Sequence, residues 1–107
     1  MLIPVDLVRV ELRVRQPKPA ALELVLPGGA MSMRCVLVRD GVQQHEFQLS
    51  WLVAELHLSS QPPCLHEGGR VELVLRDGSV ISKELSAGTL TGNAPVQVLG
   101  GDQAFQV

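Results

Sequence analysis

Apolar and charged positions alternate one by one near the start of the chain. From Val8 to Val14 every even position is apolar, and from Arg9 to Arg15 every odd position is charged. A period of two is typical of a strand with one buried and one wet face, so we expect a strand over residues 7–15. Two prolines then end it, because proline cannot donate to a ladder. Leucines at alternate positions predict a second strand over residues 21–26.

Two Asp-Gly pairs, Asp40-Gly41 and Asp77-Gly78, each follow an apolar run and precede another strand-like run. This pattern predicts hairpins with type I′ turns, because both residue types tolerate the positive φ that such a turn requires. The expected hairpins join residues 33–39 to 42–49 and residues 70–76 to 79–85. The arm over 42–49 is polar, which is typical of an edge strand or a solvent-facing strand.

The pattern over residues 51–58 fits two periods. Apolar residues at 49, 52, 53 and 56 follow a helical stripe, and apolar residues at 52, 54, 56 and 58 follow a strand face. We expect a strand, with one short helix near 50–57 as the alternative. Residues 59–69, which contain Pro62-Pro63 and Gly68-Gly69, are expected to be a loop, and residues 87–94 a connection. Short strands are expected over 96–99 and 104–107.

These elements predict an all-β protein whose single domain spans residues 1–107. Seven or eight short strands with frequent turn signals are typical of a β-sandwich or a small β-barrel. The hydrophobic fraction is 46%, but the chain has only one tryptophan, two phenylalanines and no tyrosine. Its core is therefore expected to consist mainly of valine and leucine.

The charge and the N-terminus restrict the class of protein. The net charge of −2 gives the whole chain no signature of a polyanion-binding protein. No stretch is long and apolar enough for a membrane span, and Asp6, Arg9 and Glu11 interrupt what would be the apolar part of an export signal. We therefore expect a cytoplasmic protein with reduced thiols and no membrane partner.

Cys64 and His66 are candidates for a metal site or an activated thiol in the 59–69 loop. Zinc sites usually present two close pairs of ligands, whereas here Cys35, His45 and His57 lie far away in the sequence. The chain also has no nucleophile-elbow motif. We therefore expect neither catalysis nor a cofactor, and keep a metal- or thiol-based site at Cys64 and His66 as an alternative.

Arg9, Arg13 and Arg15 share the wet face of the first predicted strand. Such a stripe can contact phosphates, which makes a nucleic-acid-binding β-barrel a second alternative. Readers of single strands also use aromatic platforms for base stacking, and three aromatic residues do not supply one.

A low charged fraction of 19% and unpaired strand edges favour protein association. Trp51 and Phe47 are the candidate anchors, because aromatic side chains dominate interface hot spots. The leading hypothesis is a non-catalytic intracellular interaction module that binds another protein or itself, as a homodimer.

Overall fold

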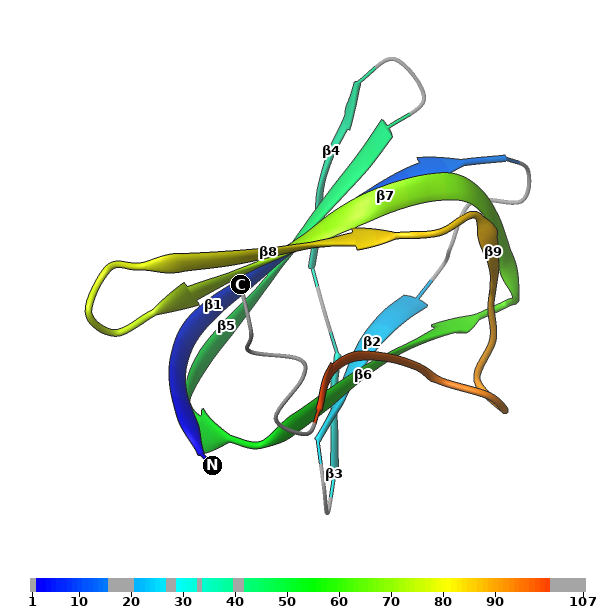
Figure 1. The fold of residues 1–107 in the computed structure, drawn as a ribbon. Helices are drawn as coiled ribbons and strands as arrows, with labels where there is room; N and C mark the ends of the chain where they lie inside the picture. The colour runs from blue at the N-terminus through cyan, green and yellow to red at the C-terminus, as the bar shows by residue number, and fades with distance from the viewer. Residues whose placement is uncertain (1, 16–20, 27–28, 33, 40–41, 101–107) are drawn as a thin grey trace.

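The computed structural model describes residues 2–15, 21–26, 29–32, 34–39 and 42–100, which form an all-β sandwich of two antiparallel sheets (Figure 1). The larger sheet has the strand order β4-β5-β1-β7-β8, with β9 also paired to β7, and the smaller sheet has the order β10-β6-β2-β3. The strands are β1 Ile3–Val14, β2 Ala21–Leu26, β3 Gly29–Ser32, β4 Arg34–Arg39, β5 Val42–Val53, β6 Glu55–Gln61, β7 Cys64–Leu75, β8 Val80–Leu85, β9 Gly88–Leu90 and β10 Val96–Gly100.

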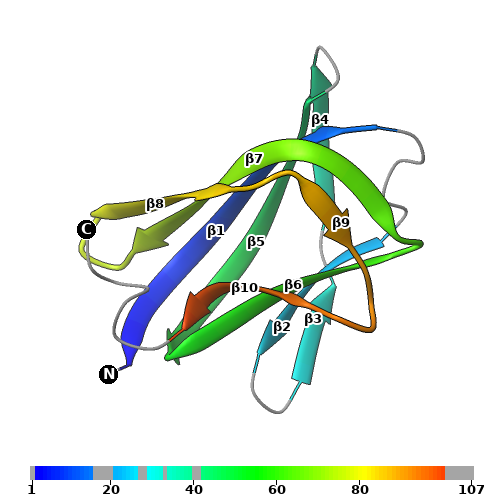
Figure 2. The same cartoon turned by 45° about the vertical axis from the view of Figure 1, so that its right-hand side comes forward.

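The all-β prediction is confirmed, and the two sheets resolve its alternatives in favour of a sandwich, because they do not close into a barrel (Figure 2). Apart from the two shortest strands, β3 and β9, the described residues contain five strands in the larger sheet and three in the smaller one. Within those same residues no helix is present, and so none that could span a membrane.

β1 lies at the centre of the larger sheet, antiparallel to β5 on one side and to β7 on the other. Its alternation has the predicted outcome: Val8, Val10 and Leu12 are completely buried. The strand begins earlier than predicted, at Ile3. An irregularity in both registers between Val5 and Leu7 keeps the side chain of Val5 buried as well, although it lies three positions before Val8.

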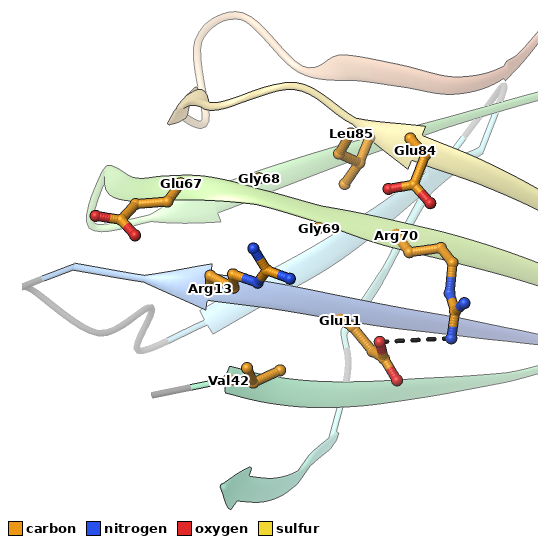
Figure 3. A pocket seen from close by; sticks show the side chains of 9 residues that line it. All are labelled: Glu11, Arg13, Val42, Glu67, Gly68, Gly69, Arg70, Glu84 and Leu85. Carbon is orange, nitrogen blue, oxygen red and sulfur yellow. Dashed lines mark ion pairs between the residues drawn. The ribbon is translucent and has the colours of Figure 1, made fainter. Parts of the chain in front are cut away.

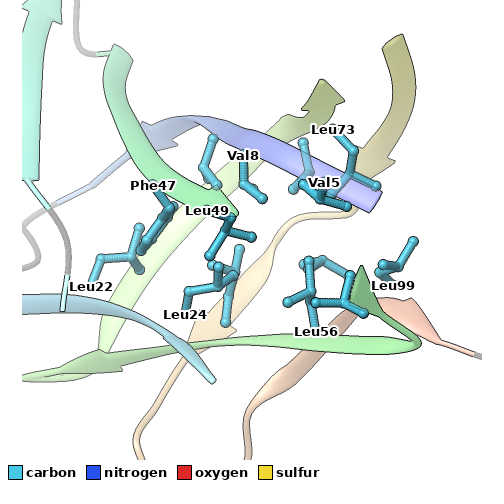
Figure 4. Packing of buried hydrophobic residues seen from close by; sticks show 14 of the residues in the cluster. Val5, Val8, Leu22, Leu24, Phe47, Leu49, Leu56, Leu73 and Leu99 are labelled. Carbon is cyan, nitrogen blue, oxygen red and sulfur yellow. The ribbon is translucent and has the colours of Figure 1, made fainter. Parts of the chain in front are cut away.

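The core lies between the two sheets, where inward side chains meet from both sides (Figure 4). In the smaller sheet, β2 has the predicted bounds, and its Leu22 and Leu24 are buried. Burying such aliphatic side chains stabilises the fold by roughly 1.5–3 kcal/mol each. The buried apolar residues are Ile3, Val5, Val8, Val10, Leu12, Leu22, Leu24, Phe47, Leu49, Val53, Leu56, Leu58, Cys64, Val71, Leu73, Leu90, Val98 and Leu99.

Both predicted hairpins are present as antiparallel pairs, β4 with β5 and β7 with β8. In the first, Arg39 pairs with Val42, and Asp40-Gly41 lies outside the described residues. In the second, the type I′ prediction is wrong. The Gly78 N–H donates to the Leu75 carbonyl at 3.0 Å, so the turn is centred on Arg76 and Asp77. Gly78 follows with a φ of 88°, which gives a three-residue loop.

Residues 51–58 are extended, as expected, and the short helix does not form. A bend at Ala54 separates β5 from β6, and the chain passes there from the larger sheet to the smaller one. Each half of the segment pairs with strands of a different sheet. The mixed period therefore reflects a corner between two strands.

Two sequence expectations fail in the second half of the chain. Residues 59–69 are not a loop, because β6 extends to Gln61 and β7 begins at Cys64, with only Pro62-Pro63 between them. These prolines mark the corner between the sheets, and Figure 1 shows β7 curving away from it across the larger sheet. The expected connection over 87–94 contains β9, which pairs with β7. The strand expected over 96–99 is present as β10, and residues 104–107 lie outside the described part.

The polar arm over 42–49 is not an edge strand. β5 pairs with β4 on one side and β1 on the other over Val42–Glu46. Its side chains alternate, so Gln44 and Glu46 face outward while Gln43 and His45 are buried. The polar residues misled the prediction because half of them point inward.

Candidate functional site

The arginines expected to contact phosphates are interleaved with carboxylates from neighbouring strands. Arg9 Nε lies 3.4 Å from Glu46 Oε1 on β5, and Arg15 Nε lies 2.8 Å from Glu67 Oε1 on β7. Arg13 is exposed, and no ion pair is found for it among the described residues. Because two of the three arginines already face an acid, the sheet presents mixed charge rather than a cationic stripe.

A hollow of about 350 Å³ lies on the same outer face, beside Arg13 (Figure 3). Arg70 reaches across it, with one terminal nitrogen 3.6 Å from Glu11 Oε2. The Glu11 carboxylate also accepts a 3.1 Å hydrogen bond from Gln44. The charged residues that line the hollow are Arg13 and Arg70 against Glu11, Glu67 and Glu84. With three acids and two guanidiniums, the hollow gives a phosphate no net attraction, which weakens the nucleic-acid alternative.

Two glycines open this hollow. Gly68 has a φ of 122°, a region that disfavours side chains, and a Cβ atom on Gly69 would collide with the backbone of Glu11. The sequence analysis treated Gly68-Gly69 as part of a loop. In the structure the two glycines allow the backbone of β7 to approach its neighbouring strand β1 closely.

Cys64 and His66 lie on one face of β7, as their spacing implies for an extended segment, but both point into the protein. The Cys64 thiol is completely buried, and burial raises its pKa. His66 is 7% exposed; its Nδ1 accepts a 3.2 Å hydrogen bond from the Gly68 N–H, and burial lowers its pKa. In the described part of the chain no group of three or more His, Cys, Asp or Glu residues is placed to hold a metal ion.

The other candidate metal ligands lie apart from this pair. His45 is on β5, where it hydrogen-bonds Gln43 at 3.2 Å, and His57 is on β6, 2.6 Å from the Glu55 carboxylate. Cys35 lies on β4, opposite His45 in the register. The alternating pattern of β5 was the available signal that His45 points inward.

Buried polar groups on β5 were missed by the sequence analysis. His45 is 1% exposed, and its Nδ1 has no hydrogen-bond partner among the described residues. Desolvation lowers its pKa to about 4, because burial disfavours the charged ring. His45 is therefore neutral at physiological pH, and its burial makes it inaccessible as a base.

The two aromatic anchor candidates have opposite environments. Phe47 is 3% exposed and packs in the core with Leu22 and Leu49, so it offers no surface to a partner (Figure 4). Trp51 is 57% exposed, on β5, beyond the residues of that strand that pair with β4. Of the two, only Trp51 is available for contact with another molecule.

Exposed apolar side chains gather on the outer face of the larger sheet, near the end of β5. Leu52 is 54% exposed and pairs with Pro4, and Val80 is 51% exposed and pairs with Val74, which in turn is opposite Leu7. The neighbouring Leu2 is 58% exposed. We refer to the following residues as the apolar end of the larger sheet: Leu2, Pro4, Leu7, Leu52, Val74 and Val80.

The outer face of the larger sheet is thus divided into two halves. The charged half carries the Arg9–Glu46 and Arg70–Glu11 pairs. The apolar end begins two positions before Arg9 on β1, at Leu7. Comparisons of the chain with protein-family models, with curated proteins and with solved structures gave no match.

Proposed function

We propose that this protein is a non-catalytic interaction module that associates with a second copy of itself through the apolar end of the larger sheet. The observation that carries the proposal is the exposure of Leu2, Leu52 and Val80 by more than half. Contiguous exposed apolar side chains are rare on monomeric soluble proteins and usually mark an interaction site.

The rim of the apolar end supports a second copy as the partner. Asp6 and Arg76 lie there, with their charged atoms 3.7 Å apart. In a two-fold symmetric contact the same surface meets itself, so an acid and a base at one rim can each face the opposite sign. A surface with one sign of charge would instead repel its own copy.

Trp51 is a separate candidate for contact with another molecule. A tryptophan combines a large apolar area with few rotatable bonds, and such residues contribute most of the binding energy at many interfaces. Trp51 lies opposite the buried Val5 in the register, so it is on the other face of β5 from Leu52 and does not belong to the apolar end.

Sedimentation velocity over a range of concentrations tests the proposal. We expect the wild-type chain to form a dimer, and we expect Leu52→Glu and Val80→Glu to be monomers, because a buried unpaired carboxylate opposes the contact. The Trp51→Ala variant, changed on the other face of β5, is expected to dimerise like the wild type.

Leu65→Glu is the matched control. Leu65 is also an exposed leucine, at 47%, but it lies on β7 opposite Thr89 and outside the apolar end. This variant should retain the wild-type dimer. A wild-type chain that stays monomeric at the highest concentration, or a Leu65→Glu effect as large as that of Leu52→Glu, would overturn the proposal.

A further inference from the structure

A second cavity lies between the two sheets. The charged hollow is on the outer side of β8, whereas this cavity is on the inner side. It measures about 320 Å³ and lies between β8, β9 and β10. β8 and β10 come at the ends of their sheets' strand orders, so the described residues leave the sandwich open here (Figure 2). Leu85, Leu90, Val96 and Val98 form apolar walls of the cavity.

Lys83 brings a positive charge to this cavity. It pairs with Val71, which is completely buried, so it lies on the inward face of β8. Its neighbours on that face, Ile81 and Leu85, pack against the core. No ion pair involves Lys83 within the part of the chain that the structure describes. A lysine in this position covers apolar surface with its alkyl chain and keeps its ammonium at the opening.

His66 lines the same cavity and adds a neutral donor. Its Nδ1 accepts the Gly68 N–H, so in the neutral ring the proton is on Nε2. Among the described residues Nε2 makes no hydrogen bond. The cavity therefore combines one cation and one N–H donor with aliphatic walls. Glu84 also lines it, but Glu84 is opposite Arg70 in the register, so its side chain lies on the outer face of β8.

We propose that the cavity binds a small carboxylate with an aliphatic body. Lys83 would bind the carboxylate, with His66 as a further donor, and the chain would lie against Leu90, Val96 and Val98. The Lys83 ammonium, which forms no ion pair within the described residues, favours an anion, and the apolar walls favour a short hydrocarbon over a hydrated ion. This proposal does not depend on self-association, because the cavity and the apolar end use different surfaces.

Octanoate is a suitable probe, and octanamide is its uncharged counterpart of the same length. We expect octanoate, titrated into the full ¹⁵N-labelled chain, to shift the backbone amides of residues 83–90 and 96–98 in a saturable way. Octanamide should bind about tenfold more weakly, because it lacks the charge-assisted contact to Lys83.

Substitutions at Lys83 separate a binding site from general hydrophobic association. Lys83→Met keeps the length of the side chain but removes the charge, and it should weaken octanoate binding about tenfold. Lys83→Arg should retain most of the affinity. Arg9→Met, which removes one cation from the outer face, is the matched control and should leave binding unchanged.

Several outcomes would overturn the proposal. They are the absence of saturable shifts with octanoate, equal affinity for octanoate and octanamide, and unchanged binding by Lys83→Met. Shifts centred on Leu52 and Val80 would instead indicate that octanoate attaches to the apolar end.

Discussion

Gly69 lies against the backbone of Glu11 so closely that no other residue type fits its position. A Cβ atom there would overlap the Glu11 carbonyl oxygen and would lie 3.2 Å from the Leu12 Cα atom. Both obstacles belong to the backbone of β1, the central strand, which cannot move without breaking its pairing to β5. At this contact the backbone of β7 lies very close to that of its neighbouring strand β1.

Gly69→Ala is expected to destabilise the protein by about 3 kcal/mol or more, because relief of the overlap requires a shift of two paired strands. Urea unfolding followed by circular dichroism measures this loss. Gly88→Ala is the control, since a Cβ atom at Gly88 has no heavy atom within 4 Å. If both variants unfold at the wild-type urea concentration, the close approach of β7 to β1 is not as described.

Gly78 is required for a different reason, its backbone conformation. Its φ is 88°, and a Cβ atom there has open space around it. Gly78→Ala should therefore cost only about 1 kcal/mol, through backbone strain alone. Gly78→Asn should cost less, because asparagine tolerates positive φ. An alanine variant as stable as the asparagine variant would contradict the three-residue turn.

Because His45 is buried in its neutral form, we expect the folded protein to lose stability in mild acid. Its pKa is about 4 in the folded protein and 6.5 as the ordinary value, so the unfolded chain binds more protons between these two pH values. Stability contributed by the neutral ring is therefore complete above pH 6.5 and falls as the pH decreases toward 4. The expected loss over this window is about 3 kcal/mol.

Urea unfolding at several pH values measures this effect as the difference between the wild type and His45→Gln. Glutamine keeps a hydrogen-bonding group near Gln43 but does not titrate, so the variant should lose less stability in acid. It should retain part of the dependence, because burial lowers the pKa of His66 as well. Identical curves for the wild type and His45→Gln would refute the assignment to His45.

Cys64 is expected to be unreactive in the folded protein. Its thiol is buried, and burial raises its pKa, so little thiolate is accessible to a disulfide reagent. In a Cys35→Ser background, labelling by a chromogenic disulfide should be on the order of a hundredfold slower in buffer than in urea. Rapid labelling without urea would restore the activated-thiol hypothesis for Cys64 and His66.

Much of the fold could be predicted because local patterns and long-range pairing agree. The alternation around Val8 and Val10 and the leucines of β2 both give strands. β2 has the predicted bounds, whereas β1 begins four residues earlier than predicted. The corners, where the chain passes from one sheet to the other, were harder to predict, because the end of one strand and the start of the next lie within a few residues of each other. Ala54 and Pro62-Pro63 turn the chain between sheets within one or two residues, so a mixed period resembled a helix and a proline pair resembled a long loop.

The candidate site was less predictable. The alternation along a strand indicates which face of the sheet a residue lies on, but it does not indicate which strand pairs beside it. Arg9 and Arg13 were correctly placed on β1, and Arg15 lies one residue beyond its end. Glu46 and Glu67, however, come from strands that only the sheet order brings beside Arg9 and Arg15. The same holds for the apolar end, where Leu52 and Val80 lie on different strands and have β1 and β7 between them. Lys83 gave no signal in the sequence, since its inward position depends on pairing with Val71.

The central place of β1 has a consequence for how the protein is made. Its partners on β5 and β7 lie about 30 to 70 positions further along the chain, as the pairs Arg13–Val42 and Val5–Leu75 show. A ribosome therefore releases β1 well before either neighbour has been synthesised. The apolar face of β1 stays unpaired until more than half of the polypeptide has been made. Folding that depends on such distant contacts is slow, so synthesis rate and chaperone binding to β1 will govern how much of the chain reaches the native sandwich.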